Sequence, residues 1–279
     1  MHYTQAQLSP PEQHTFAHLL YEQQDHVLTL TLNRPEKKNA MGPTLMREIA
    51  YMLSYAHYAA DVWMVVLQAR GDVYCAGADL RVFAGLPEEP NDSTVPDTGQ
   101  EVLLGEQLKG LHKPCIARIH APMMAGAFLL VSGCTQVYVT PAATFSLTEV
   151  KRGIWPMQVM ASLRPLLPQR TLLDLCMRGQ VLSASQALQL GLITELCADE
   201  AELDARIAGL IAELKENSPG AIRAGLAAWQ GLQHIPAEQE HAWLKQQLNT
   251  LLQTDEAKEG LAAFREKRKP DWARPAGGQ

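Results

Sequence analysis

Segments with the two-residue period of strands alternate with segments of helical spacing along most of this chain, and this alternation most constrains its fold. Val27–Leu32 alternates apolar residues with threonine, as expected for a strand with one buried face. Residues 43–59 carry Leu45, Ile49 and Leu53 at the spacing of an amphipathic helix. Such alternation is typical of an α/β protein. The same patterns predict strands over 63–69, around 74, over 115–119 and over 137–140, and helices over 125–133 and 159–167.

The last part of the chain has a different pattern. From Ala201 onward it is helical and charged, with breaks at Ser218-Pro219 and Ile235-Pro236. Leu244, Leu248 and Leu251 form an apolar stripe, which a partner subunit or the chain's own core would cover equally well. We therefore predict three parts: a loosely held extension over 1–20, an α/β core over 21–200 and a helical region over 201–279.

The overall charge and the cysteines narrow the classes of function. The net charge of −6 gives no long-range attraction for nucleic acid or an anionic membrane, so any anionic ligand needs local positive groups. The 5 cysteines are widely spaced and include no CxxC pair, which indicates reduced core thiols in a cytoplasmic protein. The longest apolar stretch, 123–131, is too short to span a membrane. His14 and His18 lack a third ligand, so no metal site is predicted.

Two further segments have local signals. Residues 85–100 are rich in Pro, Asp, Glu and Gly and look too polar to pack, which predicts a mobile loop that either covers a site or has no role. Ser183 and Gln186 have the spacing of a capping box, which predicts that a helix begins there. The turn at 75–80 is built of small residues that permit close approach of a ligand to the backbone, so it is a candidate binding turn.

Five short motifs occur in order between about residues 25 and 270. They are NRPEKKNA at 33–40, CAGADLR at 75–81, Lys113-Pro114, the segment 145–153, and AFREKRK at 263–269. Each one occurs by chance in many chains, but all five in register are specific. Through them the chain resembles the enoyl-CoA hydratase/isomerase (crotonase) family.

The resemblance implies a core of repeated ββα units that form a spiral, followed by a C-terminal α-helical trimerisation region. It also implies an oxyanion hole for a thioester oxygen, with the backbone N–H groups of Ala78 and Gly126 as donors. In the family the second donor lies in a run of glycines. Here Ala125 and Ala127 flank Gly126, and their methyl groups narrow the approach.

The resemblance places one catalytic carboxylate, Glu149, at the site. Leu129 occupies the position of the second glutamate, and no Asp or Glu occurs between Glu106 and Glu149. A single glutamate serves two reactions: it shuttles a proton during isomerisation of a 3-enoyl thioester, or it activates water for hydration of a 2-enoyl thioester. Leu129 slightly favours isomerisation, but the sequence leaves the reaction open.

The resemblance further implies contacts with coenzyme A, which enters as part of the substrate, with no permanently bound cofactor. The predicted acyl pocket contains Leu129, Trp155 and Met157. The predicted partners are an acyl-CoA and further copies of the chain, as a homotrimer or homohexamer, with neither nucleic acid nor membrane. By motif position the coenzyme A contacts are Lys38, Ala40, Ala76, Arg81, Phe264 and Lys267.

Three other functions remain open. Loss of the second glutamate is compatible with a non-catalytic CoA-binding protein. The same enolate chemistry also supports a decarboxylase or a carbon–carbon lyase acting on an acyl-CoA. A nucleic-acid role for Lys267, Arg268 and Lys269 is disfavoured by the negative total charge and by the lack of interleaved aromatic residues.

Overall fold

The computed structural model describes residues 1–274, which divide into two compact units. The first unit is Met1–Asp204 and the second begins at Ala205. The division falls within helix α8 (Glu200–Lys215), close to the change of sequence pattern at Ala201.

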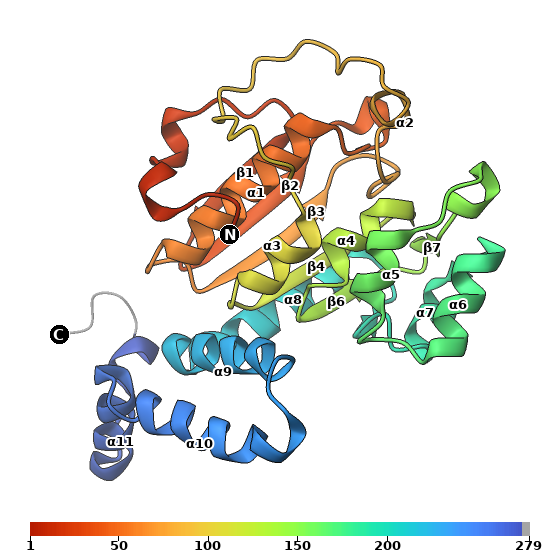
Figure 1. Cartoon of the computed structure of the whole chain (residues 1–279). Coiled ribbons are helices and arrows are strands. Elements are labelled where there is room, and N and C mark those ends of the chain that lie inside the picture. Colours follow the sequence, from red (N-terminus) through yellow and green to blue (C-terminus); the bar gives the residue numbers. More distant parts are fainter. Residues whose placement is uncertain (275–279) are drawn as a thin grey trace. The chain divides into compact units, whose positions relative to one another are not determined.

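A six-stranded sheet forms the centre of the first unit (Figure 1). Its strand order is β1-β2-β3-β4-β6-β9, and all neighbours are parallel except the antiparallel pair β1 and β2. The inward side chains of β2, such as Leu28 and Leu30, are fully buried, as the alternating pattern predicts. The strands are β1 (Leu19–Gln24), β2 (Val27–Leu32), β3 (Met64–Ala69), β4 (Cys115–Ile119), β6 (Gln136–Val139) and β9 (Glu195–Leu196).

A second, three-stranded sheet carries the segment before Glu149. Strand β5 (Met123–Met124) runs parallel to β7 (Thr144–Ser146), and β8 (Val181–Ser183) pairs with β7 antiparallel. Sequence patterns did not predict these three strands, because two or three residues are too few to show a period.

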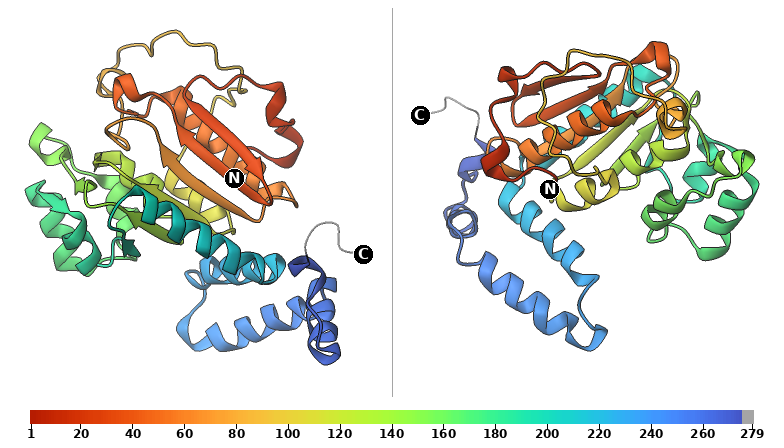
Figure 2. Two further views of the ribbon diagram at one scale, coloured as in Figure 1. Left: turned by 180° about the vertical axis from the view of Figure 1, so that it is seen from behind. Right: turned by 45° about the horizontal axis from the view of Figure 1, so that its top comes forward.

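Helices α1 and α3 lie side by side on one face of the larger sheet (Figure 2). Helix α1 begins with a proline, whose missing N–H would have no helical partner there. Lys113, buried before β4, ends it by donating from Nζ to the carbonyls of Ala56 and Ala59 at 2.5 and 2.7 Å. The helices of this unit before α8 are α1 (Pro43–Tyr58), α2 (Leu80–Phe83), α3 (Leu104–Gly110), α4 (Phe128–Val131), α5 (Met157–Leu163), α6 (Gln169–Arg178) and α7 (Ala184–Gln189).

The local predictions for the long elements are confirmed, with one correction below, whereas the short strand predicted around 74 is only an isolated bridge between Cys75 and Met123. The predicted helix over 125–133 is instead a 3₁₀ turn (Ala125–Ala127) followed by the short helix α4. It is irregular because Ala125 has a left-handed φ of 53°, which no α-helix accommodates. The predicted capping box is present: Ser183 accepts from the Gln186 backbone N–H, and Gln186 accepts from the Ser183 N–H.

The first twenty residues are packed against α1, contrary to the expectation of a loosely held extension. Tyr3 is fully buried, and its hydroxyl donates to the Pro96 carbonyl at 2.5 Å. Glu48 on α1, also fully buried, accepts from the backbone N–H groups of Ala17 and His18 at 2.6 and 3.0 Å. These contacts join residues that are distant in sequence, so a local sequence pattern cannot predict them.

The loop over 85–100 also packs, although its composition predicted a segment too polar to do so. Val95 is buried, and Thr94 pairs with Thr15 through its backbone. Together with side-chain contacts such as that of Glu88 with Thr44, these fix the loop against the first unit, where it appears as the long yellow-orange segment in Figure 1.

The second unit is helical and has the breaks that the sequence predicts. Ser218 caps α9, which begins at Pro219, and Pro236 separates α9 from α10. Trp243 and Trp272 pack over the glycines Gly231 and Gly260. The helices are α9 (Pro219–Leu232), α10 (Glu240–Leu251) and α11 (Asp255–Glu266). Within residues 1–274, no helix combines the length and apolar character needed to cross a membrane.

Candidate functional site

Asn39 fixes the loop that follows β2. It is fully buried with a left-handed φ of 52°. Its side-chain NH₂ donates to the carbonyls of Arg70, Val73 and Tyr74 at 2.8 to 3.1 Å, and its Oδ1 accepts from the Arg34 N–H at 2.8 Å. Asparagine suits this place because it tolerates the left-handed region and carries both donors and an acceptor. The loop 33–40 is thereby held against the segment leading into the turn at 75–79.

A buried ion pair joins that loop to the turn itself. Arg34 Nη1 lies 2.9 Å from Asp79 Oδ2, and the two side chains are 4% and 13% exposed. Asp79 also caps α2, accepting from the Arg81 N–H at 3.1 Å. Burial acts to raise the pKa of Asp79, but the hydrogen bonds from Arg34 and from the Arg81 backbone outweigh it and hold that pKa below its usual value.

Three backbone hydrogen bonds join the turn at 75–79 to two other segments. The Ala76 N–H donates to the Lys38 carbonyl at 2.9 Å, and the Met124 N–H donates to the Cys75 carbonyl at 3.0 Å. On the other side of the turn, the Met41 N–H donates to the Gly77 carbonyl at 2.8 Å. The turn is therefore clamped between the loop after β2 and strand β5.

The backbones of Ala78 and Gly126 lie close together across this clamp. A Cβ atom placed on Gly126 would lie 3.5 Å from the Ala78 nitrogen. Neither N–H takes part in the backbone hydrogen bonds that build the turns around it in the described residues, and Ala78 is exposed. Two unused amides on facing turns are the arrangement that an anionic oxygen requires.

Gly77 makes the close approach of the two turns possible. Its φ is 88°, and a Cβ there would lie 2.9 Å from the Gly126 nitrogen and 2.8 Å from the Ala125 Cβ. Ala125 adopts its left-handed φ directly opposite, at a cost of about 1–2 kcal/mol for a residue with a side chain. The methyl group of Ala125 thus lies against Gly77, and that of Ala127 is fully buried.

Glu149 begins a 3₁₀ turn (Glu149–Arg152) three residues after β7. Because β7 pairs with β5, in register Met124 to Ser146, the strand that leads to Gly126 also aligns the segment that leads to Glu149. Gly179, just after α6, supports the turn: a Cβ there would lie 2.9 Å from the Leu147 carbonyl oxygen.

The Glu149 carboxyl group is half-buried and incompletely paired. Its Oε2 is buried without a hydrogen-bond partner among the described residues. Burial raises the pKa of Glu149 above its usual value, and its own backbone N–H and the positive charge of Arg152 offset this only in part. A carboxylate that is poorly solvated and unpaired is suited to exchange protons with a ligand.

The three residues predicted to line the acyl pocket have different surroundings. Leu129 is half-buried against the core and points toward α3, since its Cδ2 would lie 3.8 Å from a Cβ on Gly105. The Trp155 indole is partly buried, and its N–H donates to the Met160 sulfur at 3.4 Å. Met157 is 64% exposed at the start of α5. Leu129 itself has no polar group that could act as a second acid or base.

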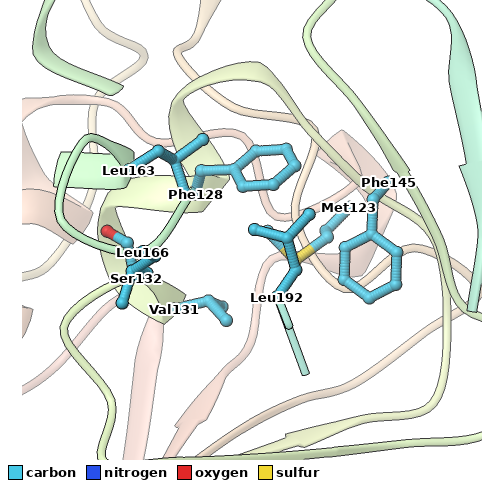
Figure 3. Close-up of a pocket in the computed structure, with 8 residues that line it drawn as sticks. All are labelled: Met123, Phe128, Val131, Ser132, Phe145, Leu163, Leu166 and Leu192. Atoms are coloured by element: carbon cyan, nitrogen blue, oxygen red, sulfur yellow. The ribbon is translucent and has the colours of Figure 1, made fainter. Parts of the chain in front are cut away.

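A small pocket of about 10 Å³ lies beside α4 (Figure 3). It contains none of Ala78, Gly126 and Glu149, so it is separate from the candidate chemistry. Its lining is apolar apart from Ser132, whose hydroxyl has no partner among the described residues. We regard it as a packing gap next to the site. The lining residues are Met123, Phe128, Val131, Ser132, Phe145, Leu163, Leu166 and Leu192.

Four of the predicted coenzyme A contacts lie around the clamped turn. Lys38 is exposed, with a left-handed φ of 53°, and its carbonyl holds Ala76. Ala40 and Ala76 are half-buried. Arg81 is 60% exposed and pairs with Glu89 at 2.9 Å.

The other two predicted contacts belong to the second unit. Phe264 is 84% exposed on α11, and Lys267 ends that helix with a left-handed φ of 54°. Both side chains are accessible within their unit, and their role stays a prediction.

The motif at 33–40 was predicted from the sequence, but the contacts of Asn39 and Glu89 that hold the motif in place were not. Asn39 follows two lysines in this loop, and its residue type is consistent with the left-handed backbone found there, because asparagine is favoured at such positions. No local signal identified Glu89, which lies 52 residues from its partner Lys37. No cluster of His, Cys, Asp and Glu that would hold a metal ion occurs in residues 1–274.

Comparison with known proteins identifies the family. The family model described as enoyl-CoA hydratase/isomerase matches residues 22–275. A mevalonyl-coenzyme A hydratase of Aspergillus fumigatus is 31% identical over 257 residues, covering 88% of this chain and 91% of that protein. A 2,3-dehydroadipyl-CoA hydratase of Escherichia coli is 28% identical, covering 91% of this chain and 98% of that protein.

Solved structures share the fold. An enoyl-CoA hydratase from Mycobacterium tuberculosis superposes with a TM-score of 0.78 at 28% identity, covering 91% of this chain and 98% of that one. An enoyl-CoA hydratase/isomerase from Marinobacter aquaeolei, at 23% identity, gives 0.81 and covers 92% and 99%. The fold is therefore the crotonase fold, as the motifs implied, and the chain belongs to the enoyl-CoA hydratase/isomerase family.

Proposed function

We propose that this protein converts an acyl-CoA thioester through an enolate, with the N–H groups of Ala78 and Gly126 holding the enolate oxygen and Glu149 as the single acid and base. The close approach of those two residues carries the proposal, because a Cβ on Gly126 would lie 3.5 Å from the Ala78 nitrogen. Two donors aimed at one oxygen stabilise the charge that develops there, and one such donor is worth roughly 10²–10³-fold in rate.

In isomerisation, Glu149 takes the α-proton of a 3-enoyl thioester. The electron pair moves to the thioester oxygen, held by Ala78 and Gly126, and forms a dienolate. Glu149 then returns the proton at the γ-carbon, so the double bond moves and the mass is unchanged.

In hydration, Glu149 takes a proton from water while the water oxygen attacks the β-carbon of a 2-enoyl thioester. The electron pair again moves to the thioester oxygen. The protonated Glu149 then gives its proton to the α-carbon, which completes the addition of one water. Both reactions need only one carboxylate.

Leu129 supports the use of a single carboxylate. It is apolar, half-buried and packed toward Gly105 and the core, so it neither holds water nor transfers a proton. The relatives whose names state a reaction are hydratases, which keeps hydration in the proposal beside isomerisation.

The test uses purified protein with a trans-2-enoyl-CoA and, separately, a 3-enoyl-CoA, and identifies products by mass and chromatography. A gain of one water from the first substrate establishes hydration. Conversion of the second at unchanged mass establishes isomerisation. Glu149→Gln is expected to lose either activity, whereas Glu22→Gln, which alters an exposed carboxylate on β1, is expected to retain it.

Other outcomes separate the alternatives. Binding of coenzyme A without turnover of any acyl-CoA would favour a non-catalytic member of the family. Loss of carbon dioxide or cleavage of the acyl chain would favour a decarboxylase or lyase that uses the same amide pair. Full activity in Glu149→Gln would contradict the single-glutamate mechanism.

A homotrimer or homohexamer is part of the proposal. In the second unit Trp229, Leu261 and Phe264 are 71%, 56% and 84% exposed, and large apolar side chains left in water favour a subunit partner. Light scattering after size exclusion tests this, and a monomer at micromolar concentration would contradict it. We also propose a cytoplasmic location, because no disulfide joins the cysteines, all of which lie in the described residues, as expected in a reducing compartment.

A further inference from the structure

Glu89, on the loop over 85–100, lies within 4.0 Å of three cationic side chains, one of which, Arg81, is a predicted coenzyme A contact. Its Oε1 lies 2.9 Å from Arg81 Nη1 and 3.0 Å from Lys37 Nζ, and its Oε2 lies 4.0 Å from Arg34 Nη2. Lys37 and Arg81 are 40% and 60% exposed, so solvent and a ligand can reach them. The hydrogen bond and charge of Lys37 hold the pKa of Glu89 below its usual value, so the carboxylate stays charged at neutral pH.

The adjacent residue, Glu88, fastens the loop to the start of α1. Its carboxylate accepts from the Thr44 N–H at 3.1 and 3.3 Å and from the Thr44 hydroxyl at 2.7 Å. A carboxylate suits that place because the first turn of a helix has unpaired N–H groups and a partial positive charge. A side chain on Gly42 would overlap Glu88, so the glycine makes room for this contact. The anchored Glu88 keeps Glu89 close to the cations.

Three cations gathered around one carboxylate have the chemistry to bind a phosphate. Arginine and lysine bind phosphate oxygens with charge-assisted hydrogen bonds, and Arg34 is already fixed by its buried pair with Asp79. Asp79 already pairs with Arg34, so Glu89 supplies the negative charge that faces the two exposed cations, Lys37 and Arg81. Asp97, farther along the same loop, pairs with Arg47, whereas Glu89 engages more than one cation.

We propose that Glu89 is an internal competitor for the coenzyme A phosphates: it occupies Arg81 and Lys37 in the free protein and must release them when the nucleotide binds. This inference rests on the proposed function, because it takes the acyl-CoA as the ligand. The loop over 85–100 then stays attached to α1 through Glu88, while the Glu89 side chain moves away from Arg81 and Lys37. The displaced carboxylate returns to the cations when the product leaves.

The test compares the wild-type protein with Glu89→Gln in calorimetric titrations with free coenzyme A. Exposed ion pairs are weak, so the variant is expected to bind about two- to fivefold more tightly. With a turned-over acyl-CoA, KM is expected to fall by the same factor while kcat is unchanged, because Glu89 does not touch the reacting carbons. Asp97→Asn is the matched control in the same loop and is expected to leave binding unchanged.

Ionic strength gives a second, independent readout. In the wild-type protein, binding exchanges one set of ion pairs for another, whereas in Glu89→Gln it creates new ones. The affinity of the variant is therefore expected to fall more steeply between about 0.05 and about 0.5 M salt. Titration with dephospho-CoA distinguishes the two sources of phosphate: a gain that persists points to the pyrophosphate, and one that disappears points to the 3′-phosphate.

The outcomes separate this inference from the proposed function. Equal affinities of both proteins for coenzyme A would overturn the competitor role and leave the proposed function intact. Weaker binding by Glu89→Gln would also overturn it, because Glu89 would then be orienting the cations rather than competing for them. No binding of coenzyme A or acyl-CoA by either protein would overturn both proposals.

Discussion

The Gly77 backbone lies so close to Gly126 that a Cβ on Gly77 would be 2.9 Å from the Gly126 nitrogen. That nitrogen is one of the two proposed oxyanion donors. The contact therefore sets how closely the turn at 75–79 and strand β5 approach, and with it the separation of the donors. A side chain at position 77 would push the two turns apart.

Gly77→Ala is expected to lower kcat by roughly 10²-fold or more, because displacement of one donor weakens the oxyanion hole. It should also destabilise the protein by about 1–2 kcal/mol, since φ is 88°. Gly85→Ala is the control: its φ is 85°, yet a Cβ there meets nothing within 4 Å. Thermal melts should show a loss for both, larger in Gly77→Ala because its Cβ also meets neighbouring backbone atoms, with kcat reduced only in Gly77→Ala. Equal kcat values would contradict the donor role.

The pH dependence of activity follows from the raised pKa of Glu149. Since the base must be deprotonated, kcat/KM is expected to fall on the acidic side with an apparent pKa above the usual 4.5 of a glutamate. A pH–rate profile measures it. An acidic limb centred at or below 4.5 would show that burial does not control this group.

The same shift has a consequence for stability. A carboxyl whose folded pKa is raised favours the fold below its unfolded pKa and loses that contribution as pH rises through the folded value. Glu149→Gln is therefore expected to melt at a higher temperature than the wild-type protein at pH 7. The difference should shrink as pH falls below about 4. A lower melting temperature for the variant at pH 7 would contradict this.

Ala125→Gly should behave unlike an ordinary alanine-to-glycine change. Relief of the left-handed φ gains about 1–2 kcal/mol, which exceeds or balances the roughly 0.5–1 kcal/mol that glycine costs through the unfolded chain. Denaturant melts should show equal or higher stability. Ala127→Gly, at a residue that is fully buried with a φ of −57°, should instead lose stability. Similar losses in both variants would remove the argument for strain.

Asp79→Asn is expected to cost about 3–5 kcal/mol, because it leaves the buried Arg34 charge without its partner. The pKa of Asp79 is lowered in the fold, so its contribution is present above the unfolded value of 3.8 and disappears as pH falls through the folded value. Chemical denaturation at pH 7 and at low pH measures both. A loss that is independent of pH would point to the α2 cap instead.

The long elements were predictable because their signals are local. The alternation in Val27–Leu32 and the helical spacing that begins at Pro43 are properties of neighbouring residues, and the structure contains both. The motifs also led to the family, which the comparisons show. Ala78, Gly126 and Glu149 were named from motif positions. The structure adds the converging turns and the buried, unpaired carboxyl oxygen of Glu149.

The errors concern contacts between distant segments. The extension over 1–20 and the loop over 85–100 were predicted not to pack, because their own residues are mostly polar. Tyr3 and Val95 are nevertheless buried by partners supplied from elsewhere in the chain. Likewise, nothing in the local pattern of 125–133 shows that Ala125 is left-handed and lies against Gly77.

The sequence by itself determined the periodic elements, the family and the presence of a single acid in the site motif, because residue type and spacing encode each of these directly. Only the tertiary structure decided which groups meet: Arg34 with Asp79 across 45 residues, and Glu89 with Lys37 across 52. Such pairs depend on strand register and on loops closing over the sheet. The free energy that selects them comes from the packing of the whole unit, so no short segment contains it.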